Sequence, residues 1–387
     1  MSERSTTGVI PRTIVGPEAA GLDPAKVDAL LARARREIDE GLLPSCQVAI
    51  GRHGKLGVFE TLGAGTNQSR YVMYSATKAF VASAFWLLLQ EGRITLDTKV
   101  ADVIPEFATN GKDVIVVEQV MLHTSGFPYA PLGHPQWETR QGRLEAFARW
   151  RLNWEPGTRF EYHATTAHWV LAELIERIDG RDHRVFLREV ILEPLGLRDV
   201  ELGVATERLG EVNRVVACGE PATPDELESA IGVRDLGPGT IPTEQLTAFS
   251  RDDVLQVGVP GGGGVTTAAD VVRFYQALLA GGPWTDATRR AFTAEVRNRF
   301  KDLMGVPANR TLGLVVKGDD EFAFMRHGRT CSPRTFGHAG AGGQIAWADP
   351  ETGISFCYLT NGIDEHVLRQ WRRSAALSNR AAVCAAA

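Results

Sequence analysis

The chain has 387 residues, of which 44% are hydrophobic and 23% are charged, and its formal net charge is −5. This composition predicts a soluble globular protein with enough apolar material for a core, and it excludes a largely disordered chain. The small net charge and the lack of a long run of Lys and Arg exclude the electrostatic footprint of a nucleic-acid binder. We therefore expect a small-molecule substrate and no nucleic acid.

Cysteine usage and the polar N-terminal residues bear on the cellular compartment. The five cysteines are an odd number and form no C-x-x-C pair, so they indicate free thiols and no zinc or redox centre. They are Cys46, Cys218, Cys331, Cys357 and Cys384. No apolar segment follows the polar start, and no apolar stretch approaches the roughly 18 residues that span a bilayer. We expect a cytoplasmic protein without membrane contact.

The first elements show clear local signals. Residues 1–20 are predicted to be an extended polar lead-in, and Asp23-Pro24 then begins an amphipathic helix that continues to about Glu40. Residues 46–60 contain two short strand-like runs separated by His53-Gly54, a turn signal that predicts a hairpin.

The next segments are mostly helical in pattern. The apolar density of residues 79–91 predicts a buried helix closed by a glycine. Residues 114–122 are compatible with a short strand or with the start of a helix. Residues 165–180 have helical periodicity and end at a glycine, and another helix is predicted over 182–193, before Pro194.

The last third of the chain begins with a long irregular segment. Residues 205–260 are rich in Pro, Gly and acidic residues and predict a long surface connection beside the site. Residues 266–280 predict a helix, and residues 343–360 predict two strands joined by the turn 349–353. A final helix is predicted over 364–382.

Strand-forming segments near both ends enclose a mostly helical middle. We therefore predict an α/β fold with one antiparallel sheet built from both chain ends and flanked by helices. Residues 21–80 and 205–387 are assigned to this α/β lobe, and residues 81–204 to an inserted helical lobe. The cleft between the two lobes is the expected place for a site.

Ser75 and Lys78 form the first motif with possible chemistry. A Ser-x-x-Lys match occurs by chance about once in a chain of this length. On a helix, however, residues three apart share a face, and the N-terminus of a helix favours negative charge nearby. Lys78 would have to be neutral part of the time to act as a base, which burial or neighbouring cations can bring about. The alternative is a serine and a solvated lysine without chemical role at a helix start.

Two further motifs lie downstream. Tyr162 follows a turn and comes immediately before the helix predicted from residue 165. The run Phe336-Gly-His-Ala-Gly-Ala-Gly-Gly343 is a glycine-rich approach to a strand, and its glycines allow the backbone to lie close to a ligand. Alternatively, Tyr162 is an aromatic cap on a helix and the glycines form a bend without function.

Together with His123-Thr-Ser-Gly126, these motifs resemble the serine β-lactamase and penicillin-binding-protein superfamily. The resemblance covers about residues 25 to 380 and is closest to class C β-lactamases and the β-lactamase-like esterases called family VIII carboxylesterases. It implies that Ser75 is the acylated nucleophile, Lys78 its proton partner, and Tyr162 the general base that later returns a proton to the leaving group. By the same resemblance, the N–H groups of Ser75 and Ala341 form the oxyanion hole.

The sequence departs from the lactamase pattern at two places. His338-Ala-Gly340 stands where the family has Lys-Thr-Gly, and histidine is more often neutral at pH 7 than lysine, so the grip on a substrate carboxylate is weakened. Tyr162-His-Ala164 lacks the asparagine of the Tyr-x-Asn element. Both departures argue against efficient β-lactam hydrolysis and are compatible with the esterase-like and peptidase-like branches.

The other candidate residues give weaker evidence for a chemical role. His123 lies in a stretch that is structural in the resembling family, and His163 and His168 lack the spacing of a zinc pair on a helix. No metal and no cofactor is expected. Three tryptophans lie between His123-Thr-Ser-Gly126 and Tyr162, where they line an acyl pocket or fill the core of the helical lobe. They are Trp137, Trp150 and Trp154.

The expected function is that of a cofactor-independent serine hydrolase of the carboxylesterase type, acting on small carboxylic esters through an acyl-serine. The alternatives on the same scaffold are an amidase or D-aminopeptidase, a weak β-lactamase and an acyltransferase. A non-catalytic sensor that keeps the fold and holds an acyl group is the alternative from another class. No oligomeric state is predicted.

Overall fold

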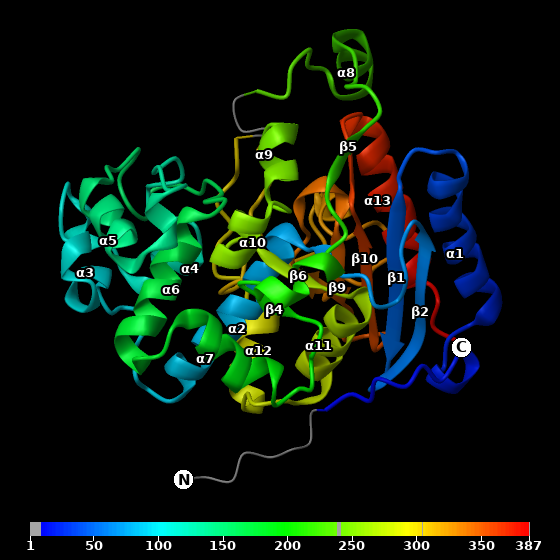
Figure 1. Cartoon of the computed structure of the whole chain (residues 1–387), viewed down its shortest axis with the longest axis horizontal. Coiled ribbons are helices and arrows are strands. Elements are labelled where there is room, and N and C mark those ends of the chain that lie inside the picture. Colours follow the sequence, from blue (N-terminus) through cyan, green and yellow to red (C-terminus); the bar gives the residue numbers. More distant parts are fainter. Residues whose placement is uncertain (1–8, 238–240, 304, 387) are drawn as a thin grey trace.

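Both ends of the chain contribute strands to one six-stranded antiparallel sheet with the order β2-β1-β10-β9-β8-β7. The computed structural model describes residues 9–237, 241–303 and 305–386 (Figure 1). The strands of the sheet are β1 (Ser45–Arg52), β2 (Lys55–Gly63), β7 (Val315–Val316), β8 (Phe336–Gly337), β9 (Ile345–Ala348) and β10 (Ile354–Thr360). The predicted sheet of both chain ends is confirmed, and so is the hairpin at His53-Gly54, which joins β1 to β2.

Alternate residues of the central strands face two different hydrophobic cores. Ala49 and Cys357 belong to the cluster on the inner face, whereas Val48, Ile50 and Phe356 belong to the cluster on the outer face. This division follows from the period of two in a strand. Both faces of β1 and β10 are therefore covered.

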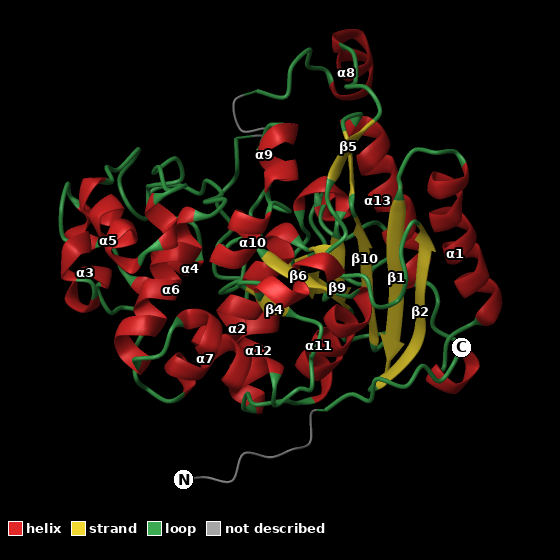
Figure 2. Cartoon of the chain, in the orientation of Figure 1, coloured by secondary structure: helices red, strands yellow, loops and turns green. Residues whose placement is uncertain are grey.

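Three long helices cover the two faces of the sheet. Helix α11 (Ala268–Ala280) contacts β1, β9 and β10 on the inner face, and α1 (Pro24–Asp39) packs with α13 (Val367–Ala382) on the other (Figure 2). Asp23 caps α1 by accepting hydrogen bonds from the N–H groups of Ala25 and Lys26 at 3.0 and 3.2 Å. The predicted helices at 24–40, 266–280 and 364–382 are confirmed.

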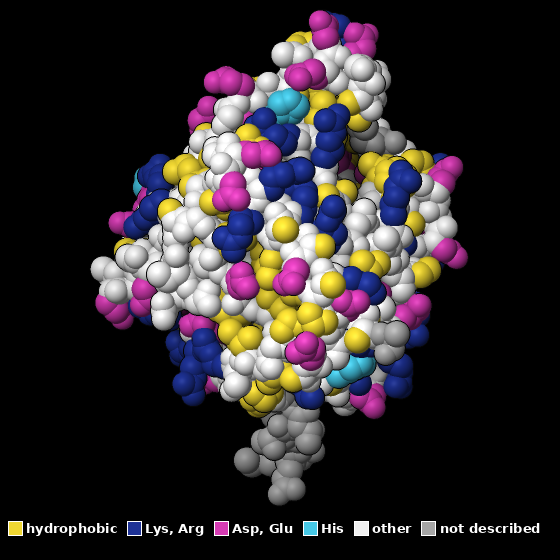
Figure 3. All heavy atoms as spheres, turned by 90° about the vertical axis from the view of Figure 1, so that its right-hand side faces the viewer, with side chains coloured by type: hydrophobic (Ala, Val, Ile, Leu, Met, Phe, Trp, Pro, Cys, Tyr) yellow, Lys and Arg dark blue, Asp and Glu magenta, His cyan; other side chains and the backbone are white. Residues whose placement is uncertain are grey.

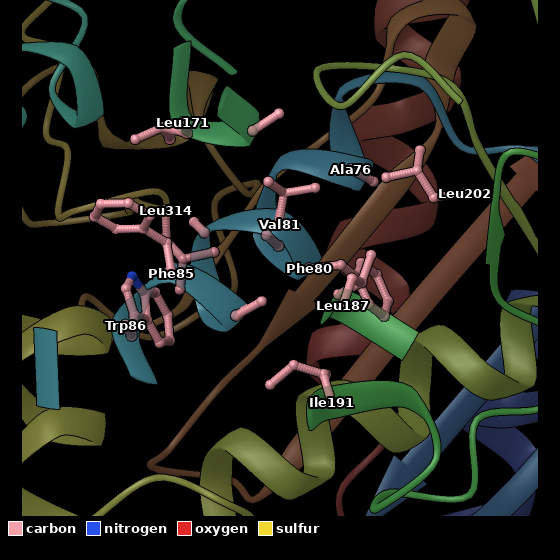
Figure 4. Close-up of a cluster of buried hydrophobic side chains, with 14 of the residues drawn as sticks. Ala76, Phe80, Val81, Phe85, Trp86, Leu171, Leu187, Ile191, Leu202 and Leu314 are labelled. Carbon is pink, nitrogen blue, oxygen red and sulfur yellow. The ribbon is translucent and has the colours of Figure 1, made fainter. Parts of the chain in front are cut away.

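Helix α2 (Thr77–Gln90) lies in the centre of the molecule and is buried on all sides, from Thr77 to Leu88. The ring of Phe80 on α2 stacks on that of Phe274 on α11 with centroids 4.0 Å apart, which joins the two helices. Figure 4 shows the same helix packed against Leu187 and Ile191. A helix that is apolar all round belongs in a core, as the sequence predicts.

The middle of the chain forms the helical side of the molecule (Figure 1). Its helices are α3 (Val100–Val103), α4 (Val117–Met121), α5 (Arg140–Arg149), α6 (Thr166–Asp179) and α7 (His183–Leu187), which continues as a π-helical turn (Arg188–Leu192). For residues 114–122 the structure selects the helical alternative. The helices predicted at 165–180 and 182–193 are confirmed as α6 and as α7 with its π turn.

Residues 205–260 hold more regular structure than the sequence predicts. They contain β5 (Val216–Cys218), α8 (Pro224–Ile231), α9 (Thr243–Ala248) and α10 (Asp252–Val257), and α8 projects from the body (Figure 1). Helices of six to eight residues give little periodic signal, which explains the difference. Strand β5 pairs in parallel with β11 (Gly362–Asp364).

A small sheet supports the segment before the Ser75 turn. Strand β6 (Gly264–Thr266) pairs antiparallel with both β3 (Tyr71–Val72) and β4 (Glu201–Leu202). The remaining long helix of the described residues, α12 (Asp286–Ala294), packs through Phe292 on Trp86 of α2, with ring centroids 4.8 Å apart.

The face that Figure 3 shows carries charges of both signs, with Lys and Arg side chains gathered across the middle of its upper half and Asp and Glu around them. None of the helices in the described part of the chain has the length and apolarity needed to cross a membrane.

Candidate active site

Ser75 lies in a tight turn, Tyr74–Ala76, between β3 and α2. The N–H of Met73 donates to the carbonyl oxygen of Gly264 at 2.9 Å, which fixes the entrance to this turn. Tyr74 has a φ of 45°, a left-handed conformation that costs about 1 to 3 kcal/mol in a residue other than glycine. Its hydroxyl donates to the carbonyl of Leu246 at 2.9 Å. The turn therefore holds a half-buried Ser75 at the start of a central helix.

Lys78 is fully buried and bonded to three oxygens. Its Nζ lies 3.3 Å from the Oγ of Ser75 and donates to the carbonyl oxygens of Ala164 and Gly261, both at 2.6 Å. Burial lowers the pKa of Lys78, the phenol of Tyr162 opposes this, and the charge of Arg310 lowers the pKa further. An amine with a lowered pKa next to a serine hydroxyl is equipped to accept the proton of that hydroxyl.

Tyr162 lies directly beside the lysine. The Nζ of Lys78 is 4.9 Å from the centroid of the Tyr162 ring, and the phenol oxygen is buried. Among the described residues that oxygen has no hydrogen-bond partner. On the other side, the ring of His123 lies 4.9 Å from the Tyr162 ring, centroid to centroid. The phenol is thus held within the cluster, beside the lysine amine.

His163 fixes the loop that carries Tyr162. Its Nε2 accepts a hydrogen bond from the N–H of Phe127 at 3.1 Å, so the proton of the neutral ring is on Nδ1, which donates to the carbonyl of Glu161 at 2.7 Å. The hydroxyl of Ser125 lies 3.1 Å from the same Nε2. Burial lowers the pKa of His163 to about 4, which keeps this arrangement neutral. His163 and Ser125 therefore act as structural supports of Tyr162.

The glycine-rich run reaches the Ser75 turn through backbone contact. A Cβ on Gly340 would lie inside contact distance of the carbonyl oxygen of Met73, so only glycine permits this approach. Ala341 follows it at the start of a short helical turn, half-exposed to solvent. A Cβ on Gly261 would similarly press on the backbone of Ala164 and Thr165, at 3.0 Å from each. Glycine at these two positions lets three separate segments meet around Ser75 and Lys78.

His338 and Arg310 form the far side of the cluster. The Nη1 of Arg310 donates to the Nε2 of His338 over 3.4 Å, so the ring proton is on Nδ1, which donates to the carbonyl of Ala339 at 2.9 Å. Burial lowers the pKa of His338 well below its ordinary value, and the charges of Arg310 and Lys78 lower it further. The ring of His338 lies 6.0 Å from that of Tyr162. His338 is therefore a neutral member of the site.

The structure brings together all the residues that the sequence singled out: Ser75, Lys78, Tyr162, His338, Gly340 and Ala341. Sequence reasoning missed three contributions. The carbonyl oxygens of Ala164 and Gly261 carry no residue signature because they belong to the backbone. Arg310 belongs to no recognised motif, and only its place in the fold identifies it.

The structure favours the core alternative for the tryptophans, since Trp150 and Trp154 are buried and the half-buried Trp137 packs against the main core. Trp150 is only 1% exposed, packs on Phe127 and Phe147, and donates its ring N–H to the carbonyl of Pro131 at 2.8 Å, so it belongs to the core. Trp154 is near the Tyr162 loop, where its ring N–H donates to Glu161 at 3.2 Å.

A serine and a buried lysine one helical turn apart, with a tyrosine beside the lysine, form the arrangement expected of a serine hydrolase of the β-lactamase fold. The sequence profile described as Beta-lactamase matches residues 27–379, and the chain belongs to this family.

Several known proteins are similar to this chain in sequence or in structure. The chain is 30% identical over 315 residues to the "Esterase/beta-lactamase LipL" of Mycobacterium tuberculosis, which covers 75% of this chain and 68% of that protein. A penicillin-binding-protein homologue from Caulobacter crescentus has a TM-score of 0.73 at 27% identity, over 92% of this chain and 99% of the other. A family VIII carboxylesterase shares the fold with a TM-score of 0.73 at 21% identity, over 92% and 99% of the two chains.

Proposed function

We propose that the protein is a carboxylesterase that cleaves small carboxylic esters through an acyl group on Ser75. The observation that carries this proposal is the direct contact of a buried lysine amine with the serine hydroxyl, 3.3 Å away, at a half-buried and reachable position. The relative at 30% identity is named as an esterase as well as a β-lactamase, which supports the same chemistry.

In the first half of the proposed reaction, the Oγ of Ser75 attacks the ester carbonyl carbon while its proton passes to Lys78. The N–H groups of Ser75 and Ala341 are proposed to hold the oxyanion. As the tetrahedral intermediate collapses, the bond to the alkoxy oxygen breaks. Tyr162, whose proton is replaced from Lys78, gives a proton to that oxygen, so the products are an alcohol and the acyl-Ser75 ester.

In the second half, water attacks the acyl-enzyme. Tyr162 and Lys78 take one proton from the water, the Ser75–acyl bond breaks, and the proton returns to Oγ. The net reaction adds one water to one ester and releases one carboxylic acid and one alcohol. The residues involved end in their starting protonation states.

Two side chains favour an ester over a β-lactam substrate. His338 is a neutral ring where the lactamase pattern has a lysine, and Ala164 has only a methyl group where that pattern has an asparagine amide, while its main-chain carbonyl is bonded to Lys78. Neither side chain provides the charge or the amide that would grip a β-lactam.

A panel of substrates tests the proposal. Wild-type protein should hydrolyse p-nitrophenyl acetate and butyrate with an initial burst, and it should be at least 100-fold less active on an anilide and on a chromogenic cephalosporin. Ser75→Ala should lose the ester activity by at least 1,000-fold, as removal of an activated nucleophile does.

Ser83→Ala provides the matched control, because Ser83 lies on the same helix and its hydroxyl donates only to the carbonyl of Phe80 at 2.8 Å. It should retain wild-type turnover. Intact-mass spectrometry during turnover should find an acyl adduct on the wild type that clears within the assay, whereas an adduct that persists for hours would indicate a sensor. Normal ester turnover by Ser75→Ala would end the assignment.

A further inference from the structure

Arg310 is a buried cation without an acidic partner in the part of the chain that the structure describes. Its side chain comes from the segment before β7, and the residue is 8% exposed. Its hydrogen-bonding contact is the ring nitrogen of His338 at 3.4 Å, and its buried Nε has no partner among the described residues. Most arginines in protein interiors bond carboxylates, because an uncompensated buried charge is costly. The position of Arg310 therefore calls for an explanation.

The guanidinium lies against the aromatic residues of the Tyr162 loop. Its central carbon is 4.9 Å from the centroid of the Tyr162 ring and 5.4 Å from that of Phe160. Lys78 reaches the same ring of Tyr162, also at 4.9 Å. Two basic side chains thus meet at one phenol, and this arrangement disfavours a second positive charge on Lys78.

We propose that Arg310 is a positioning residue of the reaction, whose fixed charge beside Tyr162 keeps the amine of Lys78 free to take the proton of Ser75. This inference rests on the roles proposed above for Ser75, Lys78 and Tyr162. In this proposal Arg310 carries the positive charge that the neutral His338 lacks.

The other groups around Lys78 do not supply that charge. Besides Ser75, Tyr162 and Arg310, the titratable side chains that face the lysine are His123, His168 and His338. All three imidazoles are buried, and burial lowers their pKa values well below the ordinary value, so they are neutral. No carboxylate of the described residues contacts Lys78 or Arg310. Arg310 therefore supplies the permanent positive charge of the cluster. Because it lies close to the amine, this charge lowers the pKa of Lys78.

The pH dependence of kcat/KM for an activated ester tests this role. In the wild type the activity should rise with pH as Lys78 loses its proton. In Arg310→Met the neighbouring charge is gone, so Lys78 should keep its proton to higher pH. The acidic limb should move upward by about one pH unit, with a fall of about tenfold in kcat/KM at pH 7. Arg310→Lys, which preserves the charge, should keep the limb within about 0.3 units of the wild type.

Arg299→Met is the matched control, because Arg299 lies in the same region and its Nη1 donates to Asn309 at 3.1 Å, away from the lysine. The acidic limb of kcat/KM in Arg299→Met should lie at the same pH as in the wild type. A purely structural role of Arg310 would lower the rate of Arg310→Met at every pH and leave the limb in place, and that result would overturn the proposal. If Arg310→Met does not fold, Arg310→Gln replaces it. An upward shift of the limb in a folded Arg310→Lys would also contradict the proposal.

The two proposals fail in different ways. Ester turnover that survives Ser75→Ala removes the proposed function itself. If ester turnover depends on Ser75 but the acidic limb is the same in Arg310→Met and in the wild type, only the role proposed for Arg310 is contradicted.

Discussion

Gly340 is the residue at which one added methyl group should disturb the site most directly. Its Cβ would meet the carbonyl oxygen of Met73, a backbone atom that cannot rotate away. We expect Gly340→Ala to push the glycine-rich run away from the Ser75 turn, to lower kcat/KM at least tenfold and to reduce the free energy of unfolding by about 1 to 3 kcal/mol. Ester assays and urea unfolding measure the two effects.

Gly133→Ala is the control for this substitution, since no atom lies within 4 Å of its added Cβ and its φ is not left-handed. It should leave both quantities unchanged. Wild-type activity in Gly340→Ala would show that the contact with Met73 does not constrain the site.

At the scale of residues, the sequence predicts the groups that belong to a recognisable motif. Ser75, Lys78 and Tyr162 are identifiable because their types and their order along the chain are informative. Arg310 is not identifiable in this way, since its importance arises from a ring 148 positions earlier, which only the tertiary structure brings near. The backbone acceptors of Lys78 escape prediction for the same reason.

Among the elements, α13 is fixed to α1 by a buried ion cluster. Arg373 of α13 is fully buried, and its Nη1 lies 3.0 Å from both Glu37 of α1 and Asp364 of β11. Removal of one member of such a cluster leaves its partners charged and buried. We expect Arg373→Met to lower the free energy of unfolding by about 3 kcal/mol in urea unfolding at pH 7.

The neighbouring Arg372→Met offers the comparison, because Arg372 is exposed on the same helix. It should change stability by less than about 0.5 kcal/mol. Equal stabilities of the two variants would mean that Arg33 and Arg369, which also contact Glu37 and Asp364, hold the cluster without Arg373.

Elements with strong local signals are those that the sequence predicts. The β1–β2 hairpin has a turn at His53-Gly54, and α1 has a cap at Asp23 followed by proline. Within 205–260, α8 has such signals, a capping box of Thr223 and Glu226 with a proline in the first turn, which the irregular composition of the segment obscures. Helix α9 has no side-chain cap and is held by the body of the protein. Leu246 of α9, for example, accepts a hydrogen bond from the buried Tyr74.

For the molecule as a whole, buried neutral histidines make stability depend on pH. Burial lowers the pKa of both His163 and His327 to about 4. Their pKa values in the unfolded chain are near 6.5, so between pH 6.5 and 4 the unfolded state binds more protons than the folded state. Stability is therefore complete above about pH 6.5 and decreases as the pH falls. Each histidine contributes up to about 1.4 kcal/mol per pH unit to this decrease.

His327→Gln tests this origin of acid sensitivity away from the site. The Nε2 of His327 lies 3.0 Å from the carbonyl oxygen of Val315, a bond that a glutamine amide is able to make. Urea unfolding at pH 7, 6 and 5 should show a slope of stability against pH that is shallower in the variant, by about 1 kcal/mol per unit. Identical slopes in the two proteins would assign the acid sensitivity to other groups.

The pairing of β1 with β10 has a consequence for how the protein acquires its structure. The hydroxyl of Thr360 on β10 donates to the carbonyl of Ser45 on β1, across 315 positions of sequence. During synthesis the ribosome must release β10 before the middle of the sheet is complete, and until then β1 keeps an open edge able to pair with other chains. Closing so long a loop is entropically costly and slow. We therefore expect slow refolding from urea, with a yield that falls as protein concentration rises.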